Sequence, residues 1–166
     1  MVGGLTAVRS CRAALAAALL VLVLPAAGRT AAVQPTANEA AVLVDLNHAR
    51  LAHGLPPLGS DVRLIRAARG HSAAMLASGT FDHGPFSSRI RQQGVPAGRF
   101  GETIGWASRP SGAARLIVAL WLASPPHRRI LLSHVFDRVG IGISVGRFQG
   151  KPHAFVVTAD FLGPLK

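Results

Sequence analysis

Three kinds of apolar pattern follow one another along the 166-residue chain: an unbroken run, then helical stripes, then alternating positions. The unbroken run, Ala13–Leu24, follows two arginines and precedes a stretch of small residues. Its twelve residues are too few for a bilayer core, which needs about 20 helical residues. This order of features is typical of a secretory signal peptide. We therefore expect residues 1–32 to be a signal peptide cleaved near residue 28 or 32, with an uncleaved anchor as the alternative.

After a short polar lead at 33–38, apolar residues recur every three or four positions in two long segments, which predicts amphipathic helices. The first helix is expected to begin at Glu39 and to end at Gly54. The second is expected to be capped by Asp61 and stopped by Gly79. The apolar stripes consist of Val42, Leu46, Ala49 and His53 in the first helix and of Leu64, Ala68, His71 and Met75 in the second.

Three shorter helical segments are predicted further along the chain. A short helix covers 88–93. Ser111 is expected to cap the next helix, and Pro125-Pro126 to close it. A helical turn at 127–132 follows.

The pattern changes to alternation near the end of the chain. Val139, Ile141, Ile143 and Val145 alternate with small residues, and 154–162 is rich in Phe and Val. A turn-like stretch at 146–152 joins the two runs, so a β-hairpin is predicted. Helices first and strands last indicate an α+β fold, in which helices cover a small antiparallel or mixed sheet. Residues 39–166 are enough for one such domain.

The charge balance is strongly basic, with 18 Lys and Arg against 7 Asp and Glu and a formal charge of +11. Cleavage after residue 32 would remove three arginines and no acid, leaving 15 against 7, a charge of +8. No basic run with interleaved aromatics is present, so nucleic acid is not the expected partner. Anionic envelope polymers or lipid head groups fit the positive field better. The single Cys11 excludes an internal disulfide and a multi-cysteine zinc site.

One apparent catalytic motif fails in its context. Residues 142–146 read Gly-Ile-Ser-Val-Gly, which matches the G-x-S-x-G pattern of a nucleophile elbow. That motif needs a strand, a sharp turn and then a helix, whereas Ser144 falls inside the alternating run. We therefore predict that Ser144 is a strand residue and not a nucleophile.

Three polar residues occupy expected loops or helix ends, where functional groups are often placed: His83, Glu102 and His127. Two imidazoles and one carboxylate suit Zn²⁺ or a related ion, with a fourth position open. The three lie far apart in sequence, so spacing alone does not identify a site. His83 could instead brace its loop by a hydrogen bond, His127 could cap the preceding helix, and Glu102 could accept backbone N–H bonds.

Several ordered motifs together resemble the CAP superfamily of cysteine-rich secretory, antigen 5 and pathogenesis-related proteins, and more narrowly its cysteine-poor bacterial branch. The motifs are His71-Ser72, a His after the second helix, Gly-Glu-x-Ile-x-Trp at 101–106, Trp-x-x-Ser-Pro-x-His-Arg at 121–128 and Gly140-x-Gly142. They cover roughly residues 40–163. The resemblance implies a three-layer α-β-α sandwich, which agrees with the pattern of helices and strands.

The resemblance also implies a cleft with two histidines and two glutamates, which binds a divalent metal in some members. His83, Glu102 and His127 match three of these four positions, and Ser124 stands where the second glutamate is expected. The missing acid weakens any mechanism that needs a pair of carboxylates. His71 is expected to be a hydrogen-bonded residue behind the site, and Arg128 is a candidate anion contact beside it.

These observations predict a secreted or periplasmic protein with a His/Glu-lined cleft and no membrane span after cleavage. The leading hypothesis is binding of an envelope component, a small hydrophobic molecule such as a lipid or sterol, or a divalent cation such as zinc. One alternative is a metal-assisted hydrolase of peptide, peptidoglycan or phosphoester bonds, with Glu102 as ligand or general base. Another is a structural exported domain with a basic surface. Binding is favoured over catalysis because no nucleophile–base–acid triad is visible.

Overall fold

The computed structural model describes residues 1, 3, 33–108 and 111–165. The predicted cleavage sites near 28 and 32, and the apolar run before them, lie outside the described residues. Residues Ala32–Lys166 form one compact unit. Within the described ranges no helix combines the length and apolarity that a membrane span requires.

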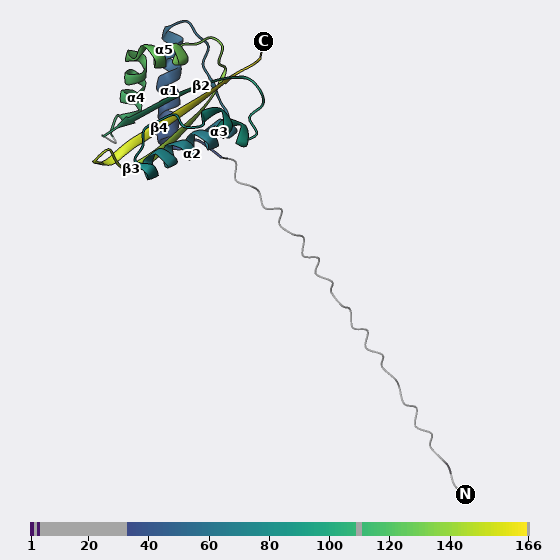
Figure 1. Cartoon of the computed structure of the whole chain (residues 1–166). Coiled ribbons are helices and arrows are strands. Elements are labelled where there is room, and N and C mark those ends of the chain that lie inside the picture. The colour runs from purple at the N-terminus through teal and green to yellow at the C-terminus, as the bar shows by residue number, and fades with distance from the viewer. Residues whose placement is uncertain (2, 4–32, 109–110, 166) are drawn as a thin grey trace. The chain divides into compact units, whose positions relative to one another are not determined.

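The described unit is a three-layer α-β-α sandwich around a four-stranded mixed sheet (Figure 1). The helices are α1 (Ala37–Ala52), α2 (Val62–Ser78), α3 (Phe86–Gln92), α4 (Ala113–Ala123) and α5 (Pro125–Leu131), and the strands are β1 (Gly59–Ser60), β2 (Arg99–Ala107), β3 (Arg138–Phe148) and β4 (Lys151–Gly163). The sheet order is β1-β3-β4-β2, with β1 parallel to β3 and the other pairs antiparallel. Helices α2 and α3 pack on one face, and α1 and α4 on the other. The predicted α+β class and the layered architecture are confirmed.

The ends of the two long helices follow from their capping residues. Thr36 and Glu39 form a capping box at the start of α1, each accepting a hydrogen bond from the other's backbone N–H. The helix therefore begins two residues before the predicted Glu39. Asp61 caps α2, and Gly79 ends it with a left-handed φ of 71°. Both predicted ends of α2 are confirmed.

Other boundaries differ from the prediction. Gly112, not Ser111, is the N-cap of α4, with a left-handed φ of 71° and no side-chain capping bond. Pro125 does more than close α4, because it also begins α5, where proline's missing N–H is tolerated. Helix α3 begins at Phe86 and not at 88. Ser144 lies inside β3, as predicted.

Strand β4 supplies both faces of the sheet. Its Phe155, Val157, Ala159 and Phe161 belong to the apolar core beneath α1 and α4. Because strand residues alternate between faces, the residues between them point toward α2 and α3. The Ser72 hydroxyl in α2 donates a hydrogen bond to the Thr158 hydroxyl at 2.9 Å, which confirms that Thr158 points toward α2.

Two glycines allow α2 to lie directly on the sheet. A Cβ at Gly140 would be 2.1 Å from the backbone carbon of Leu64, and one at Gly142 would be 2.1 Å from the backbone nitrogen of Arg69. The Gly140-x-Gly142 motif is therefore a packing feature. It fixes the height above the sheet of the helix that carries His71.

Candidate functional site

Glu102 lies in β2, an edge strand of the sheet, and not in a loop as the sequence suggested. The sequence pattern missed β2 because glycines interrupt its apolar positions. Glu102 pairs in register with Asp160 of β4, so the two carboxylates are cross-strand neighbours. Both residues are buried, Glu102 with 5% and Asp160 with 0% of its surface exposed. Two acids thus share the sheet face covered by α2 and α3.

Both carboxylate oxygens of Glu102 are engaged. His83 Nδ1 lies 2.6 Å from Oε1, and Arg89 Nη2 donates to Oε2. Burial raises the pKa of Glu102, and the neighbouring Arg89 cation partly offsets this increase. The geometry makes Glu102 a buried partner that orients His83, with each of its oxygens already accepting one hydrogen bond.

His83 is the exposed end of this cluster. Its side chain is 54% exposed, against 2% for the Glu102 side chain. The loop that carries it is held from two sides: His71 Nε2 donates to the Asp82 carbonyl at 2.9 Å, and Arg89 Nη1 donates to the His83 carbonyl at 3.2 Å. Because Nδ1 faces Glu102, Nε2 is the nitrogen left for a ligand or a proton.

Arg89 and Asp160 complete the cluster, and the sequence analysis missed both. Arg89 Nη2 lies 3.5 Å from Asp160 Oδ1, so one guanidinium serves two carboxylates. Among the described residues, neither Asp160 oxygen nor Arg89 Nε has a hydrogen-bond partner. Burial and the Glu102 charge raise the pKa of Asp160 well above its usual value, although Arg89 opposes this. The only signal in the sequence was an acid inside the apolar run 154–162.

His127 lies in α5, on a different element from His83 and Glu102. Burial lowers its pKa, and so does the charge of His83. Within 33–108 and 111–165, however, no three His, Cys, Asp or Glu side chains are placed to hold one metal ion. Glu102 also fits poorly as a metal ligand, because its oxygens already serve His83 and Arg89. Metal binding by His83, Glu102 and His127 stays a prediction.

The three weaker candidates have different environments. His71 is buried with Nε2 3.9 Å from Glu102 Oε2, and burial and the Arg89 charge lower its pKa, which disfavours a charged ion pair at this contact. Ser124 sits between α4 and α5 and makes no side-chain capping bond to α5. Arg128 is exposed, and its Nη2 lies 3.4 Å from His53 Nε2 beside the end of α1.

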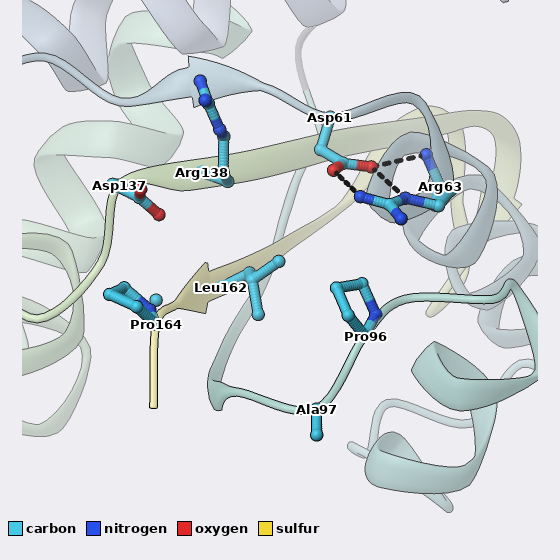
Figure 2. Close-up of a pocket in the computed structure, with 9 residues that line it drawn as sticks. Asp61, Arg63, Pro96, Ala97, Asp137, Arg138, Leu162 and Pro164 are labelled. Atoms are coloured by element: carbon cyan, nitrogen blue, oxygen red, sulfur yellow. Dashed lines mark hydrogen bonds and ion pairs between the residues drawn. The ribbon is translucent and has the colours of Figure 1, made fainter. Parts of the chain in front are cut away.

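Two hollows of the described surface lie away from this cluster. One, with a volume of about 210 Å³, lies between the start of α2 and the end of β4, where Asp61 and Arg63 pair (Figure 2). The other, with about 440 Å³, is a groove between α1 and α4. The groove is lined by Asp45, His48, Ala49, Arg115, Val118, Ala119 and Leu122.

The α-β-α layers place this fold in the class of SCP-domain sandwiches. An extracellular protein containing an SCP domain from Bacillus anthracis str. Ames is similar to it, with a TM-score of 0.64 and 26% identity over 76% of this chain and 40% of that one. An outer surface protein from Borrelia burgdorferi shares the fold, with a TM-score of 0.59 and 21% identity over 81% of this chain and 97% of the other.

Sequence comparison assigns the family. The chain belongs to the CAP, or cysteine-rich secretory protein, family, whose model matches residues 43–161. A Bacillus subtilis (strain 168) relative named uncharacterized membrane protein YlbC is 31% identical over 113 residues, which is 65% of this chain. The match spans 32% of that relative's length. The likeness therefore concerns this domain and not the whole relative.

Proposed function

We propose that this chain is an exported CAP-domain protein that binds an amphiphilic component of the cell envelope in the groove between α1 and α4. The observation that supports this proposal is that both aliphatic and charged residues line the groove. Val118, Ala119 and Leu122 offer an aliphatic wall, and Arg115 and His48 offer cationic groups. Its volume of about 440 Å³ falls in the range of small-molecule sites, roughly 300–1,000 Å³.

The groove favours an anionic head group joined to an aliphatic chain. Among the residues that line the groove, Arg115 contributes a guanidinium group and Asp45 a carboxyl group. Apolar atoms of the ligand would be removed from water against the aliphatic wall, and the head group would pair with the guanidinium. The excess of basic over acidic residues, 15 against 7 after removal of residues 1–32, would attract the same ligands from a distance.

A fatty acid and the matching fatty alcohol, both below their critical micelle concentrations, test this proposal. Ala119→Trp, which fills the exposed groove wall, should weaken binding of both at least about tenfold, equivalent to about 1.4 kcal/mol. Arg115→Gln should weaken binding of the acid and leave that of the alcohol unchanged. Ala74→Trp, at an exposed position of α2, is the matched control. Equal binding by wild type and Ala119→Trp would contradict the proposal.

A second candidate function uses the His83 cluster. An imidazole held by a buried carboxylate, with Nε2 outward, is suited to proton transfer in hydrolysis. Glu102 itself is badly placed as the general base, because it is buried and both its oxygens are engaged. Assays on peptidoglycan and phosphodiester substrates with wild type and His83→Ala test this alternative. Turnover that the variant loses would establish catalysis.

A further inference from the structure

We infer that the outer surfaces of α1 and α4 dock this protein on an anionic bilayer surface. The inference extends the proposed function, because it names the source from which the groove would take its ligand. It rests, however, on four aliphatic side chains that do not line the groove, together with the charges around them. Four large aliphatic residues are the first evidence: Val44 (50% exposed), Leu51 (56%), Leu116 (42%) and Leu120 (50%).

The spacing of these residues places each pair on one side of its helix. Val44 and Leu51 are seven positions apart in α1, and Leu116 and Leu120 are four apart in α4. Helices α1 and α4 pack against each other, with the groove between them. The two aliphatic ridges therefore flank one opening.

The charges around these ridges are the second evidence. Every charged residue in α4 and α5 is an arginine: Arg115, Arg128 and Arg129, all exposed. On α1, His48 and His53 are exposed, Asp45 is half-buried, and Glu39 is buried in an ion pair with Arg69. Aliphatic ridges rimmed by arginines are complementary to a bilayer with anionic head groups.

The residue types favour a lipid surface over a protein partner. Protein interfaces concentrate aromatic anchors in their cores. The exposed large hydrophobic side chains of α1 and α4 are all Val or Leu. Phe81, the aromatic residue among the exposed large hydrophobics of the described ranges, follows α2. Insertion of short aliphatic side chains into the head-group region needs no spanning helix.

Vesicle co-sedimentation tests the inference with the compact unit Ala32–Lys166, which contains all the described helices and strands. Its cooperative thermal unfolding is checked first. The unit should bind vesicles that contain phosphatidylglycerol more tightly than vesicles of phosphatidylcholine alone. The double variant Leu116→Ser/Leu120→Ser should bind at least about tenfold more weakly, and Arg128→Gln/Arg129→Gln should bind more weakly with a smaller salt dependence.

Two exposed residues near the tip of the β3–β4 hairpin provide matched controls. Val145→Ser and Arg147→Gln remove the same kinds of side chain from another part of the surface and should leave vesicle binding unchanged. Equal losses in these controls, or no preference for anionic vesicles, would overturn the inference. So would a dimer in light scattering that Leu116→Ser/Leu120→Ser dissociates, because the face would then join two copies of the chain.

The fatty-acid assay separates this inference from the proposed function. Binding of the soluble acid without vesicle binding would refute docking and keep the groove. Vesicle binding that Ala119→Trp leaves intact, together with no binding of the soluble acid, would refute the groove and keep docking.

Discussion

The two faces of the sheet receive different side chains from the same strand. Toward α1 and α4, β4 presents Phe155, Val157, Ala159 and Phe161, which join a continuous apolar core. Toward α2 and α3 it presents Ala154, Val156 and Leu162, which join two smaller apolar clusters, and between them Thr158 and Asp160, which contact Ser72 and Arg89. Both faces gain free energy by apolar burial, but the α2 and α3 side, the polar face, also depends on paired charges and hydrogen bonds. The alternation of a single strand thus confines the buried charges of the His83 cluster to one face of the sheet.

The largest effect on stability is expected where the polar face lies closest to α2. Gly142→Ala should destabilise the protein by about 3 kcal/mol or more, because the new Cβ would overlap backbone atoms of α2 that cannot move independently. Urea unfolding measures the change. Gly70→Ala is the control, since nothing lies within 4 Å of its added Cβ, and it should stabilise α2 by up to about 1 kcal/mol. Equal unfolding midpoints for Gly142→Ala and wild type would contradict the close packing.

Removal of the shared cation tests whether charge pairing holds the polar face together. Arg89→Met leaves Glu102 and Asp160 buried without their guanidinium, which should cost about 3–5 kcal/mol at neutral pH. The loss should shrink in acid, where both carboxyl groups are protonated. Arg63→Met breaks a more exposed ion pair with Asp61 and should cost at most about 1 kcal/mol. Denaturant titrations at two pH values compare the variants, and equal losses would show that burial of the cluster is unimportant.

Asp160 should give the polar face a pH dependence opposite to that of the capping acids. Its folded pKa is raised by burial and by Glu102, so its stabilising contribution is complete below its unfolded value of 3.8. That contribution is lost as pH rises through the folded pKa. Hydrogen bonds from Arg63 lower the pKa of Asp61 despite the opposing effect of burial, so its contribution is instead lost as pH falls.

Asp160→Asn sharpens this prediction. Relative to wild type, the variant should gain stability as pH rises from about 4 toward neutrality, because the amide carries no charge to bury. Thermal unfolding across that range measures the difference. Asp61→Asn is the reference, and its stability relative to wild type should change with pH in the opposite direction. A difference between Asp160→Asn and wild type that does not change with pH would contradict the raised pKa.

The sequence predicted what local periodicity determines and missed what pairing determines. The apolar stripe from Leu64 to Met75 and the capping residues predicted α2, because the residues that determine a helix face or a cap lie within a few positions of one another. Strand β2 was missed, because it is an edge strand whose glycines pack against Phe136 and Trp121 instead of continuing an apolar pattern. The partnership of His83 with Glu102 followed from the family resemblance. Arg89 and Asp160 could not be found locally, because the β2–β4 register places Asp160 beside Glu102 and Arg89 reaches both acids from α3.

The smallest expected effect concerns zinc at the edge of the polar face. If zinc binds, it should bind weakly and reversibly, because His83 Nε2 and His127 are the available ligands while Glu102 is engaged elsewhere. Both imidazoles must be deprotonated to ligate. Binding should therefore fade as pH falls below roughly 6.5, and burial and the His83 charge let His127 stay neutral somewhat further into acid.

His127→Ala tests both the ligand role and the independence of the fold from metal. The variant should lose zinc binding in isothermal titration yet change stability in chelator by no more than about 1 kcal/mol, because the core beneath α1 and α4 contains no metal ligand. His134→Ala, at an exposed position, should keep whatever zinc binding the wild type has. Calorimetric unfolding with zinc and with chelator completes the comparison. If chelator alone unfolds the wild type, the metal site is structural, and the fold is not independent of the metal.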